Sequence, residues 1–335
     1  MTCHTALRAI CALALGLLLS AVAQAQLFRT YIAPDGVDGN PCTLAAPCRL
    51  LPAALATVID GGEIWMLGSA NYNTAPVNIN KSVTILAVPG ALGSVVAIGG
   101  NAINIATAGV KVSLRNLVIV PFVGGGGTNG IVMTAGIGLT VENCLIANLP
   151  GTGIVVVGPT NVLVTDATIR GNTTYGLYAQ NGARATVARS TFSNNAQAGV
   201  FLRSDNTSTT TADIGDSTMS ANGFGVLGQS DIAGAVVKIS VNNSRTVQNA
   251  SAGVQISSVA GGPVTASVSN NIISNNFIGI RTFASGSKVL ASGNTVSDNG
   301  TGLKNDAAVI ESTGDNAVRN NTTQTSGTIT PITKL

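Results

Sequence analysis

Three successive stretches of the chain read IANLPGTGIVVVGPTNVLVTDAT (residues 146–168), IRGNTTYGLYAQNGARATVARST (169–191) and FSNNAQAGVFLRSDNTSTTTADIGDST (192–218). Each begins with a large apolar residue and continues with a short polar stretch. A Gly then follows, and directly after it an aliphatic residue. The pair of Gly and aliphatic residue recurs from Gly130 to Leu303 at intervals of 23 to 28 residues. Repetition at such a period is typical of a solenoid, in which each repeat packs only on its neighbours.

Within each repeat, apolar and polar residues alternate over short stretches, as in Ala185-Thr186-Val187 and Val254-Gln255-Ile256. This is the spacing of a β-strand, and no repeat has room for a helix of three turns. The sequence therefore predicts an all-β fold, a parallel β-helix solenoid of about 23-residue coils. Coils of this kind stack about 4.8 Å apart, and like residues lie above one another.

This stacking assigns roles to whole columns of residues. Because Gly tolerates positive φ, the recurring glycines are predicted as structural corners: Gly153, Gly176, Gly199, Gly225, Gly253, Gly279 and Gly302. The residues after the repeated glycines are predicted to form one interior ladder: Ile131, Ile154, Leu177, Val200, Val226, Val254, Ile280 and Leu303. A ladder of hydrogen-bonded amides is predicted for Asn271, Asn294 and Asn316.

The longer coils carry polar insertions. They lie between Leu202 and Ile214, at residues 229–234 and at residues 259–263. Insertions in successive coils are expected to gather on one flank of the solenoid, and such a flank is often functional.

The chain divides into four predicted segments. Residues 1–25 resemble a cleavable signal peptide, with Arg8 before a short apolar run and a cut near Ala25/Gln26. Residues 26–80 are predicted as an N-terminal cap with an amphipathic helix, RLLPAALATVI, over residues 49–59. Residues 81–321 are predicted as β-helix coils, and residues 322–335 as a C-terminal cap or tail. The protein is thus expected to be secreted or periplasmic, with no membrane span after signal removal.

Export determines the interpretation of the cysteines. Cys42 and Cys48, six residues apart in a turn-rich stretch, are predicted to form a disulfide. A metal-binding pair is the alternative, but no other Cys or His is available to complete a zinc site. Cys144 lies among aliphatic residues and is predicted as a buried free thiol, whose role the sequence does not reveal.

Charge and histidine content exclude two classes of function. Only 9% of the 335 residues are charged and the formal net charge is +3, which argues against nucleic acid as a partner. The only histidine is His4, within the predicted signal peptide. The mature chain therefore lacks a His-based triad or a His metal ligand.

The entry of the chain resembles that of bacterial pectin-lyase-like β-helix proteins. The resemblance rests on Tyr31 to Cys48, on residues 50–59, on GGEIW at residues 61–65 and on the Asn-x-x-x-Gly-Ile/Val coils. It implies a right-handed parallel β-helix with a short N-terminal capping helix. The superfamily includes lyases, hydrolases and epimerases of polysaccharides, but fold does not fix function. The Gly-His-Gly and Arg-Ile-Lys tripeptides of its polygalacturonases and the Arg-x-Pro-x-x-Arg context of its pectate lyases are absent.

Register gives a candidate binding surface. If the residue after each recurring Gly points inward, the next one points outward. That outward column reads Val132, Val155, Tyr178, Phe201, Leu227, Gln255, Arg281 and Lys304. Aromatic rings beside Arg203, two residues beyond Phe201, suit a polysaccharide. The alternative is that inserted loops cover these aromatics, or that they are ordinary exposed apolar residues.

Acidic residues are scattered. Asp213, expected to point outward, and Asp216, expected at a corner, are the nearest pair within a coil. They could flank a glycosidic bond or bind calcium, but a corner role for Asp216 is the favoured interpretation. Asp35 to Asn40 departs from the calcium-loop consensus, and a glycine-rich turn explains it better. The prediction is therefore no metal site and no cofactor, with calcium as the alternative.

The predicted function is an exported, non-catalytic β-helix that binds extracellular polysaccharide along an outward sheet face. The candidate ligand-binding residues are Tyr178, Phe201, Arg203, Asp213 and Arg281. The alternative is a polysaccharide lyase, hydrolase or epimerase with an unusual site. An adhesin is a third possibility that the C-terminal residues do not support. The sequence leaves the ligand and the oligomeric state open.

Overall fold

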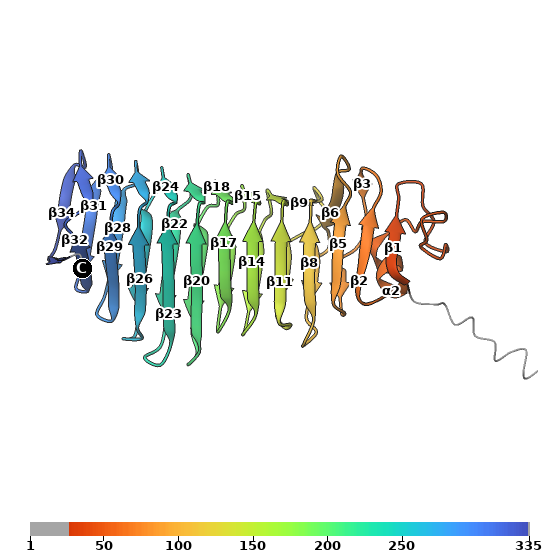
Figure 1. The fold of residues 1–335 in the computed structure, drawn as a ribbon, viewed down its shortest axis with the longest axis horizontal. Helices are drawn as coiled ribbons and strands as arrows, with labels where there is room; N and C mark the ends of the chain where they lie inside the picture. The colour runs from red at the N-terminus through yellow and green to blue at the C-terminus, as the bar shows by residue number, and fades with distance from the viewer. Residues whose placement is uncertain (1–26, 334–335) are drawn as a thin grey trace, which may run out of the picture.

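The computed structural model describes residues 27–333 as an elongated stack of about 11 coils that runs from one end of the molecule to the other (Figure 1). Each coil contributes one strand to each of three parallel sheets, here called A, B and C. The predicted signal peptide, residues 1–25, lies outside the described residues. Within the described part, no helix is long and apolar enough to cross a membrane.

Sheet A faces the viewer in Figure 1 and has 13 strands, β1 and β2 followed by every third strand. Its strands are β1 (Leu27–Ile32), β2 (Val58–Met66), β5 (Val83–Ala87), β8 (Lys111–Arg115), β11 (Gly138–Glu142), β14 (Asn161–Thr165), β17 (Arg184–Ala188), β20 (Thr209–Gly215), β23 (Val236–Asn242), β26 (Val264–Ser269), β29 (Ser287–Ser292), β32 (Val309–Thr313) and β35 (Ile329–Ile332).

Sheets B and C each have 11 strands. Sheet B comprises β3 (Ala70–Asn71), β6 (Gly93–Ala97), β9 (Leu117–Pro121), β12 (Leu145–Ala147), β15 (Thr168–Arg170), β18 (Thr191–Ser193), β21 (Thr218–Ser220), β24 (Arg245–Val247), β27 (Ile272–Ser274), β30 (Thr295–Ser297) and β33 (Ala317–Arg319). Sheet C comprises β4 (Val77–Ile79), β7 (Ile103–Ile105), β10 (Ile131–Met133), β13 (Ile154–Val157), β16 (Tyr175–Gln180), β19 (Ala198–Ser204), β22 (Phe224–Ser230), β25 (Ala252–Ser258), β28 (Ile278–Phe283), β31 (Thr301–Asp306) and β34 (Thr323–Ser326).

The predicted interior ladder is confirmed. Ile154 pairs with Ile131 on one side and with Leu177 on the other, and the register continues to Leu303. All eight residues of the ladder are buried. Each fully buried aliphatic side chain contributes about 1.5–3 kcal/mol relative to an exposed one. This continuous apolar column stabilises coils that could not fold singly.

Buried asparagines join the coils at the corner between sheets B and C. Asn222 donates from Nδ2 to Oδ1 of Asn249 (3.2 Å), and its own Oδ1 accepts from Nδ2 of Asn195 (3.0 Å). The ladder runs through Asn172, Asn195, Asn222, Asn249, Asn276, Asn299 and Asn321. The predicted ladder of Asn271, Asn294 and Asn316 is also present, at the corner between sheets A and B. These amides supply the hydrogen bonds that buried corner backbone requires.

The role predicted for the recurring glycines is wrong in its physical reason. None of the seven has the left-handed backbone conformation. Gly153 directly precedes a sheet C strand and the other six are the second residue of one, where the coils approach closely. A Cβ at Gly225 would lie 2.5 Å from the carbonyl oxygen of Gly253. The left-handed corner residues are others, among them Asn143, Asp166 and Asp216. The corner role expected for Asp216 is thus confirmed.

Helix α2 (Leu51–Thr57) covers the N-terminal end, as Figure 1 shows. Its Leu51, Ala54 and Leu55 are buried in the core, so an amphipathic helix is present where one was predicted. It is shorter than residues 49–59, because the β-branched Val58 and Ile59 begin strand β2 instead. The Cys42–Cys48 disulfide is also confirmed, in the loop that precedes the helix. Asp38 of this loop accepts hydrogen bonds from the backbone amides of Arg49 and Leu50.

Two further predictions can be compared with the structure. Cys144 is a buried free thiol, as expected, and burial raises its pKa to about 12. Strand pairing continues beyond residue 321, where the coils were expected to end, because β34 pairs with β31 and β35 with β32. The repeat was hard to recognise there because Thr325 follows Leu303 in the interior ladder.

Candidate functional site

The outward column predicted on sheet C is present. Tyr178 pairs with Val155 and with Phe201, which in turn pairs with Leu227. The column continues through Gln255 and Arg281 to Lys304. Because strand pairing is in register, these side chains stand above one another at intervals of about 4.8 Å.

The aromatic members of this column form an apolar cluster on the outside of the solenoid. Tyr178 and Phe201 are stacked with ring centroids 5.1 Å apart and planes inclined by 16°. Tyr175 adds a third ring, 5.2 Å from Tyr178 and 5.0 Å from Phe201. Phe224 packs on the same cluster, and Leu227 completes it. We call these five residues the sheet C cluster.

The rings of the cluster do not form a flat surface open to solvent. The rings stack on one another along the solenoid axis, so their faces contact neighbouring rings instead of solvent. Phe201 is only 5% exposed and Leu227 only 9%. Contacts of this kind contribute about 0.5–1.5 kcal/mol per aromatic pair beyond burial. A ligand would therefore meet ring edges and the two tyrosine hydroxyl groups rather than open ring faces.

Arg203 lies beside the cluster and is held by three partners. Its Nε donates to Oδ2 of Asp231 at 2.6 Å, and its Nη1 donates to the Tyr178 hydroxyl oxygen at 3.3 Å. Asp205 is an ion-pair partner at 3.6 Å. Gln229 also donates to Asp231, at 2.6 Å. The guanidinium is therefore surrounded by two carboxylates, and this part of the surface carries no excess of positive charge.

The network has electrostatic consequences. Hydrogen bonding to Tyr178 and to Asp231 raises the pKa of Arg203 further above its ordinary value. Burial raises the pKa of Tyr178, and the hydrogen bond from Arg203 offsets part of that rise. Burial also raises the pKa of Tyr175. Both hydroxyl groups are thus protonated at neutral pH and available as hydrogen-bond donors.

A depression of about 580 Å³ lies over the cluster. It is lined by aromatic residues, including Tyr175 and Tyr178, and by the polar residues Gln197, Arg203 and Gln229. An apolar floor with a few polar groups around it is the usual composition of a small-molecule or glycan site.

The longer inserted loops border this region. The segments at residues 205–208, 231–235 and 259–263 connect β19 to β20, β22 to β23 and β25 to β26. They all lie at the corner between sheets C and A in three successive coils, so the predicted gathering on one flank is confirmed. Two of these loops supply Asp205 and Asp231 to Arg203.

The structure does not bring all the predicted site residues together. Tyr178, Phe201 and Arg203 are neighbours, but Asp213 lies on β20 in sheet A, paired with Thr186 and Ser240. The chain turns a corner between Arg203 and Asp213, which separates residues that are close in sequence. Asp213 therefore cannot act with Arg203, and that part of the prediction is wrong.

Arg281 lies on sheet C but three coils beyond Arg203. It donates to Oδ2 of Asp306 at 2.7 Å, and its guanidinium lies 5.1 Å from the centre of the Phe283 ring. It is absent from the lining of the depression. The sequence interpretation missed Tyr175 and Phe224, which directly precede the recurring Gly176 and Gly225 and could have been found from that position.

Calcium ligands do not converge here. Among residues 27–333, no three His, Cys, Asp or Glu side chains lie together as a metal site would require. Within the same range, no carboxylate lines the depression, and Asp205 and Asp231 both pair with Arg203 at its edge. These residues do not fit the calcium alternative.

Known proteins share this architecture. A family described as right handed beta helix region matches residues 101–261. No curated protein matches the sequence. The crystal structure of pectate lyase Pel9A superimposes with a TM-score of 0.57 at 18% identity, covering 87% of this chain and 78% of that chain. The complex of XylC with xylose gives a TM-score of 0.57 at 9% identity, covering 83% and 69% of the two chains.

A mutant of the periplasmic alginate epimerase AlgG gives a TM-score of 0.55 at 14% identity, covering 81% of this chain and 77% of that chain. At these identities the likeness concerns the fold and carries no activity with it. The repeat, the three parallel sheets and these matches lead to one assignment: the chain folds as a right-handed parallel β-helix, the fold that it shares with a pectate lyase and an alginate epimerase.

Proposed function

We propose that the protein is exported and binds an extracellular polysaccharide, without catalysis, in the depression over the sheet C cluster. The observation that carries the proposal is the lining of that depression, where tyrosine and phenylalanine residues lie beside Arg203 and two glutamines. Sugars present both apolar C–H faces and hydroxyl groups, so this mixture complements them. The Cys42–Cys48 disulfide supports an oxidising compartment.

The charges around Arg203 favour an uncharged glycan. A free arginine would attract a carboxylate, but Arg203 is already paired with Asp205 and Asp231. An acidic ligand would have to displace one of these aspartates, which costs an existing ion pair. The neighbours include a complex with the neutral sugar xylose, which is compatible with this choice.

A catalytic role is the second candidate, because Tyr178, Arg203 and Asp231 form one connected polar network at the depression. The direction of the tyrosine pKa opposes it. A general base must lose its proton near neutral pH, whereas burial raises the pKa of Tyr178. The network thus suits hydrogen bonding to a ligand better than proton abstraction.

The test measures binding of neutral polysaccharides, such as xylan and glucan fragments, by glycan array and calorimetry. The double variant Tyr175→Phe/Tyr178→Phe keeps all three stacked rings and removes only the two hydroxyl groups. We expect its affinity to fall on the order of tenfold, as the loss of two ligand hydrogen bonds implies. Tyr31→Phe, on sheet A, is the matched control and should bind as the wild type does.

Unchanged affinity in the double variant, or no binding of any neutral glycan, would refute the proposed site. Turnover is measured in parallel with xylan, polygalacturonate and alginate. Product formation that Arg203→Ala abolishes would establish the catalytic alternative instead.

A further inference from the structure

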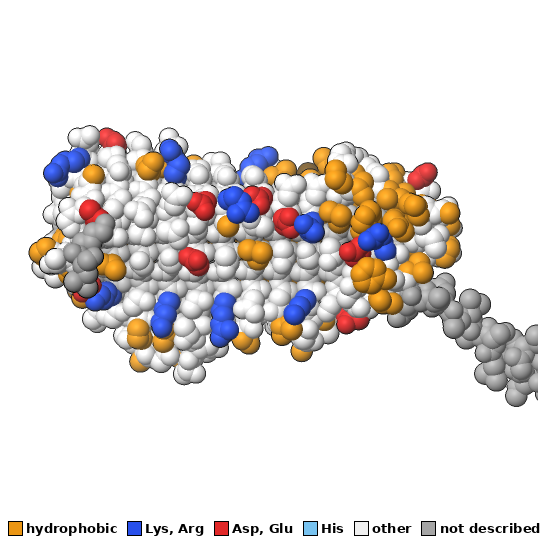
Figure 2. All heavy atoms as spheres, viewed as in Figure 1, with side chains coloured by type: hydrophobic (Ala, Val, Ile, Leu, Met, Phe, Trp, Pro, Cys, Tyr) orange, Lys and Arg blue, Asp and Glu red, His pale blue; other side chains and the backbone are white. Residues whose placement is uncertain are grey.

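The outward face of sheet A carries a second depression, of about 660 Å³, remote from the one on sheet C. It extends along six adjacent strands, from β8 to β23. Figure 2 shows this face toward the viewer, with Lys and Arg side chains in a line along its lower part. Nothing in the proposed function involves these residues.

The line of cations follows from strand register. Lys111, Arg184 and Lys238 occupy equivalent positions near the N-terminal ends of their sheet A strands, as the pairings from β8 through β23 show. Arg184 is three coils from Lys111 and two coils from Lys238. These intervals correspond to about 14 Å and about 10 Å along the axis. All three side chains are exposed.

These three cations differ from most others on the surface because none forms an ion pair with a carboxylate within residues 27–333. Lys288, two coils beyond Lys238 in the same column, is already paired with Glu311 at 2.6 Å. Within this column of sheet A, the unpaired positive charge therefore lies in the stretch that the depression covers.

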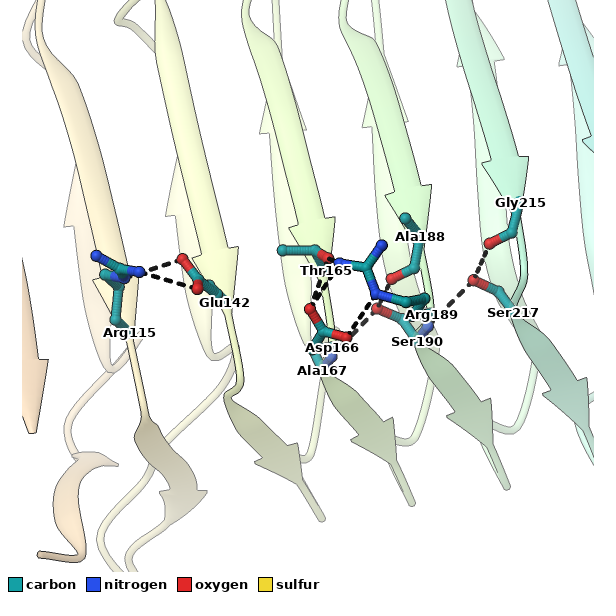
Figure 3. A network of polar contacts seen from close by, with 10 residues as sticks. All are labelled: Arg115, Glu142, Thr165, Asp166, Ala167, Ala188, Arg189, Ser190, Gly215 and Ser217. Carbon is teal, nitrogen blue, oxygen red and sulfur yellow. Dashed lines mark hydrogen bonds and ion pairs between the residues drawn. The ribbon is translucent and has the colours of Figure 1, made fainter. Parts of the chain in front are cut away.

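The opposite border of the face is electrically balanced. Figure 3 shows Arg115 against Glu142 and Arg189 against Asp166, with N–O distances of 2.9 Å and 2.8 Å. These pairs lie at the end of the sheet A strands and at the following corner. The free charge thus lies along one side only, and a ligand would be aligned parallel to the solenoid axis.

The floor between the two borders combines polar side chains with the exposed side chain of Leu163. It offers the hydroxyls of Thr140, Thr186 and Ser240 and includes one carboxylate, that of Asp213. The charged lining residues give this depression a net charge of +2. Asp213, which the sequence placed with Arg203, is instead the one acidic group that an anionic ligand would meet here.

The spacing of the cations selects the class of ligand. A compact anion would reach only one of them, because neighbouring cations stand about 10 Å or more apart. A linear polymer with regularly repeated anionic groups can contact all three. In an extended acidic glycan, a sugar unit advances by nearly the rise of one coil, so its charges recur in step with the strands.

The lining argues against nucleic acid. Single-stranded DNA and RNA are held by aromatic side chains on which bases stack, and no Phe, Tyr or Trp lines this depression. Hydroxyl and amide side chains such as Asn161 and Thr211 suit the hydroxyl groups of sugars instead.

We propose that the groove on sheet A binds a linear acidic polysaccharide, whose carboxylate or sulfate groups contact Lys111, Arg184 and Lys238. This site is separate from the proposed site on sheet C and uses a different ligand charge.

The experiment compares two triple variants of equal charge change. Lys111→Gln/Arg184→Gln/Lys238→Gln removes the line of cations, whereas Arg170→Gln/Arg245→Gln/Arg319→Gln removes three exposed cations from sheet B. Affinity electrophoresis and calorimetry are run with polygalacturonate, dextran sulfate, neutral dextran and single-stranded DNA at physiological salt. Thermal unfolding confirms that each variant is folded.

We expect the sheet A triple to lose affinity for an acidic glycan by on the order of tenfold, and the sheet B triple by less than about twofold, since only the former removes contacts. Asp213→Asn should tighten binding. Polygalacturonate and dextran sulfate distinguish carboxylate from sulfate recognition. Equal losses in both triples, no binding of either acidic glycan, or equally tight binding of DNA would overturn the proposal. Tyr175→Phe/Tyr178→Phe should leave this binding unchanged, so the two sites can fail independently.

Discussion

Tyr178 on sheet C stacks on Phe201 one coil away, and Arg203 reaches Asp231 in the next coil. Arg184 on sheet A stands in an equivalent column, between Asn161 and Thr211, and has no carboxylate partner among the described residues. Both faces are built from in-register parallel strands, and they differ in whether an outward side chain finds a partner in a neighbouring coil.

Whether outward side chains pair within the solenoid therefore determines which of its faces remains available to a ligand. Identical register places like positions about 4.8 Å apart on both sheets, so complementary neighbours pair with one another, and a ligand meets only the parts of these side chains that the pairing leaves exposed. Neighbours that cannot pair, such as Lys111 and Gly138, remain available. The sheet C cluster is therefore expected to contribute to stability, and the sheet A groove mainly to binding.

The largest expected effect is a difference in unfolding free energy between glycine-to-alanine substitutions on the two sheets. In Gly225→Ala on sheet C, the new Cβ would lie 2.5 Å from the Gly253 carbonyl oxygen, which belongs to rigid backbone. In Gly138→Ala on sheet A, the nearest atom is Cγ of Lys111 at 3.5 Å. We expect the first to lower the free energy of unfolding by about 3 kcal/mol, and the second to change it by less than about 1 kcal/mol.

Chemical denaturation of both variants measures these differences. Equal losses would contradict the view that the coils approach more closely on sheet C than on sheet A.

A smaller effect is expected from Phe201→Ala. Phe201 is 5% exposed and stacks on Tyr178, whereas Leu163 on sheet A is 38% exposed. Removing the ring should cost about 2 kcal/mol of unfolding free energy, since burial and ring stacking are both lost. Leu163→Ala should cost less than about 0.5 kcal/mol. Thermal unfolding of the two variants measures this difference. A Phe201→Ala protein as stable as Leu163→Ala would mean that the sheet C cluster does not stabilise the fold.

The interior ladder and the outward column of sheet C could be predicted because the recurring glycine marks the same point in every coil. In-register pairing then makes Tyr178 and Phe201 neighbours by counting alone. Tyr175 was missed since the counting began after the glycine. The sheet A cations were missed because no invariant residue marks where its strands begin, so Lys111 and Arg184 cannot be aligned from sequence spacing alone.

The partners of Arg203 could not be predicted for a different reason. Asp205 and Asp231 lie in loops at the corner after β19 and β22, outside the repeat. Loop residues do not obey coil periodicity, so their contacts depend on the path of each loop. The same loop after β19 carries the chain from sheet C to sheet A, which is why Asp213 was wrongly grouped with Arg203.

Replacing Arg203 and Arg184 in turn should show that an ion-paired arginine contributes more to stability than an unpaired one. Arg203→Met leaves Asp231, whose side chain is 17% exposed, without its cation. We expect a loss of about 1 kcal/mol in unfolding free energy, since Arg203 itself is 35% exposed and solvent screens the pair. Arg184→Met should change stability by less than about 0.5 kcal/mol. Unfolding at low and high salt provides the check, because only the loss at Arg203 should shrink as salt screens the pair. Equal behaviour of the two variants would contradict the distinction between the faces.

The smallest effect concerns the alkaline titration of the sheet C cluster. Burial raises the pKa of Tyr178 and of Tyr175, whereas an unfolded tyrosine ionises near pH 10, at about its ordinary value. Above that pH the unfolded chain loses these protons before the folded protein does. The stability that the neutral rings provide is therefore complete below about pH 10 and declines as pH rises through the folded pKa.

Tyr178→Phe has no such proton to lose and should show a shallower decline. Difference absorbance of tyrosinate, wild type minus Tyr178→Phe, should reveal a transition above that of a model tyrosine. A transition at or below the model value would mean that Tyr178 is not desolvated, and that the sheet C cluster is as open as the groove on sheet A.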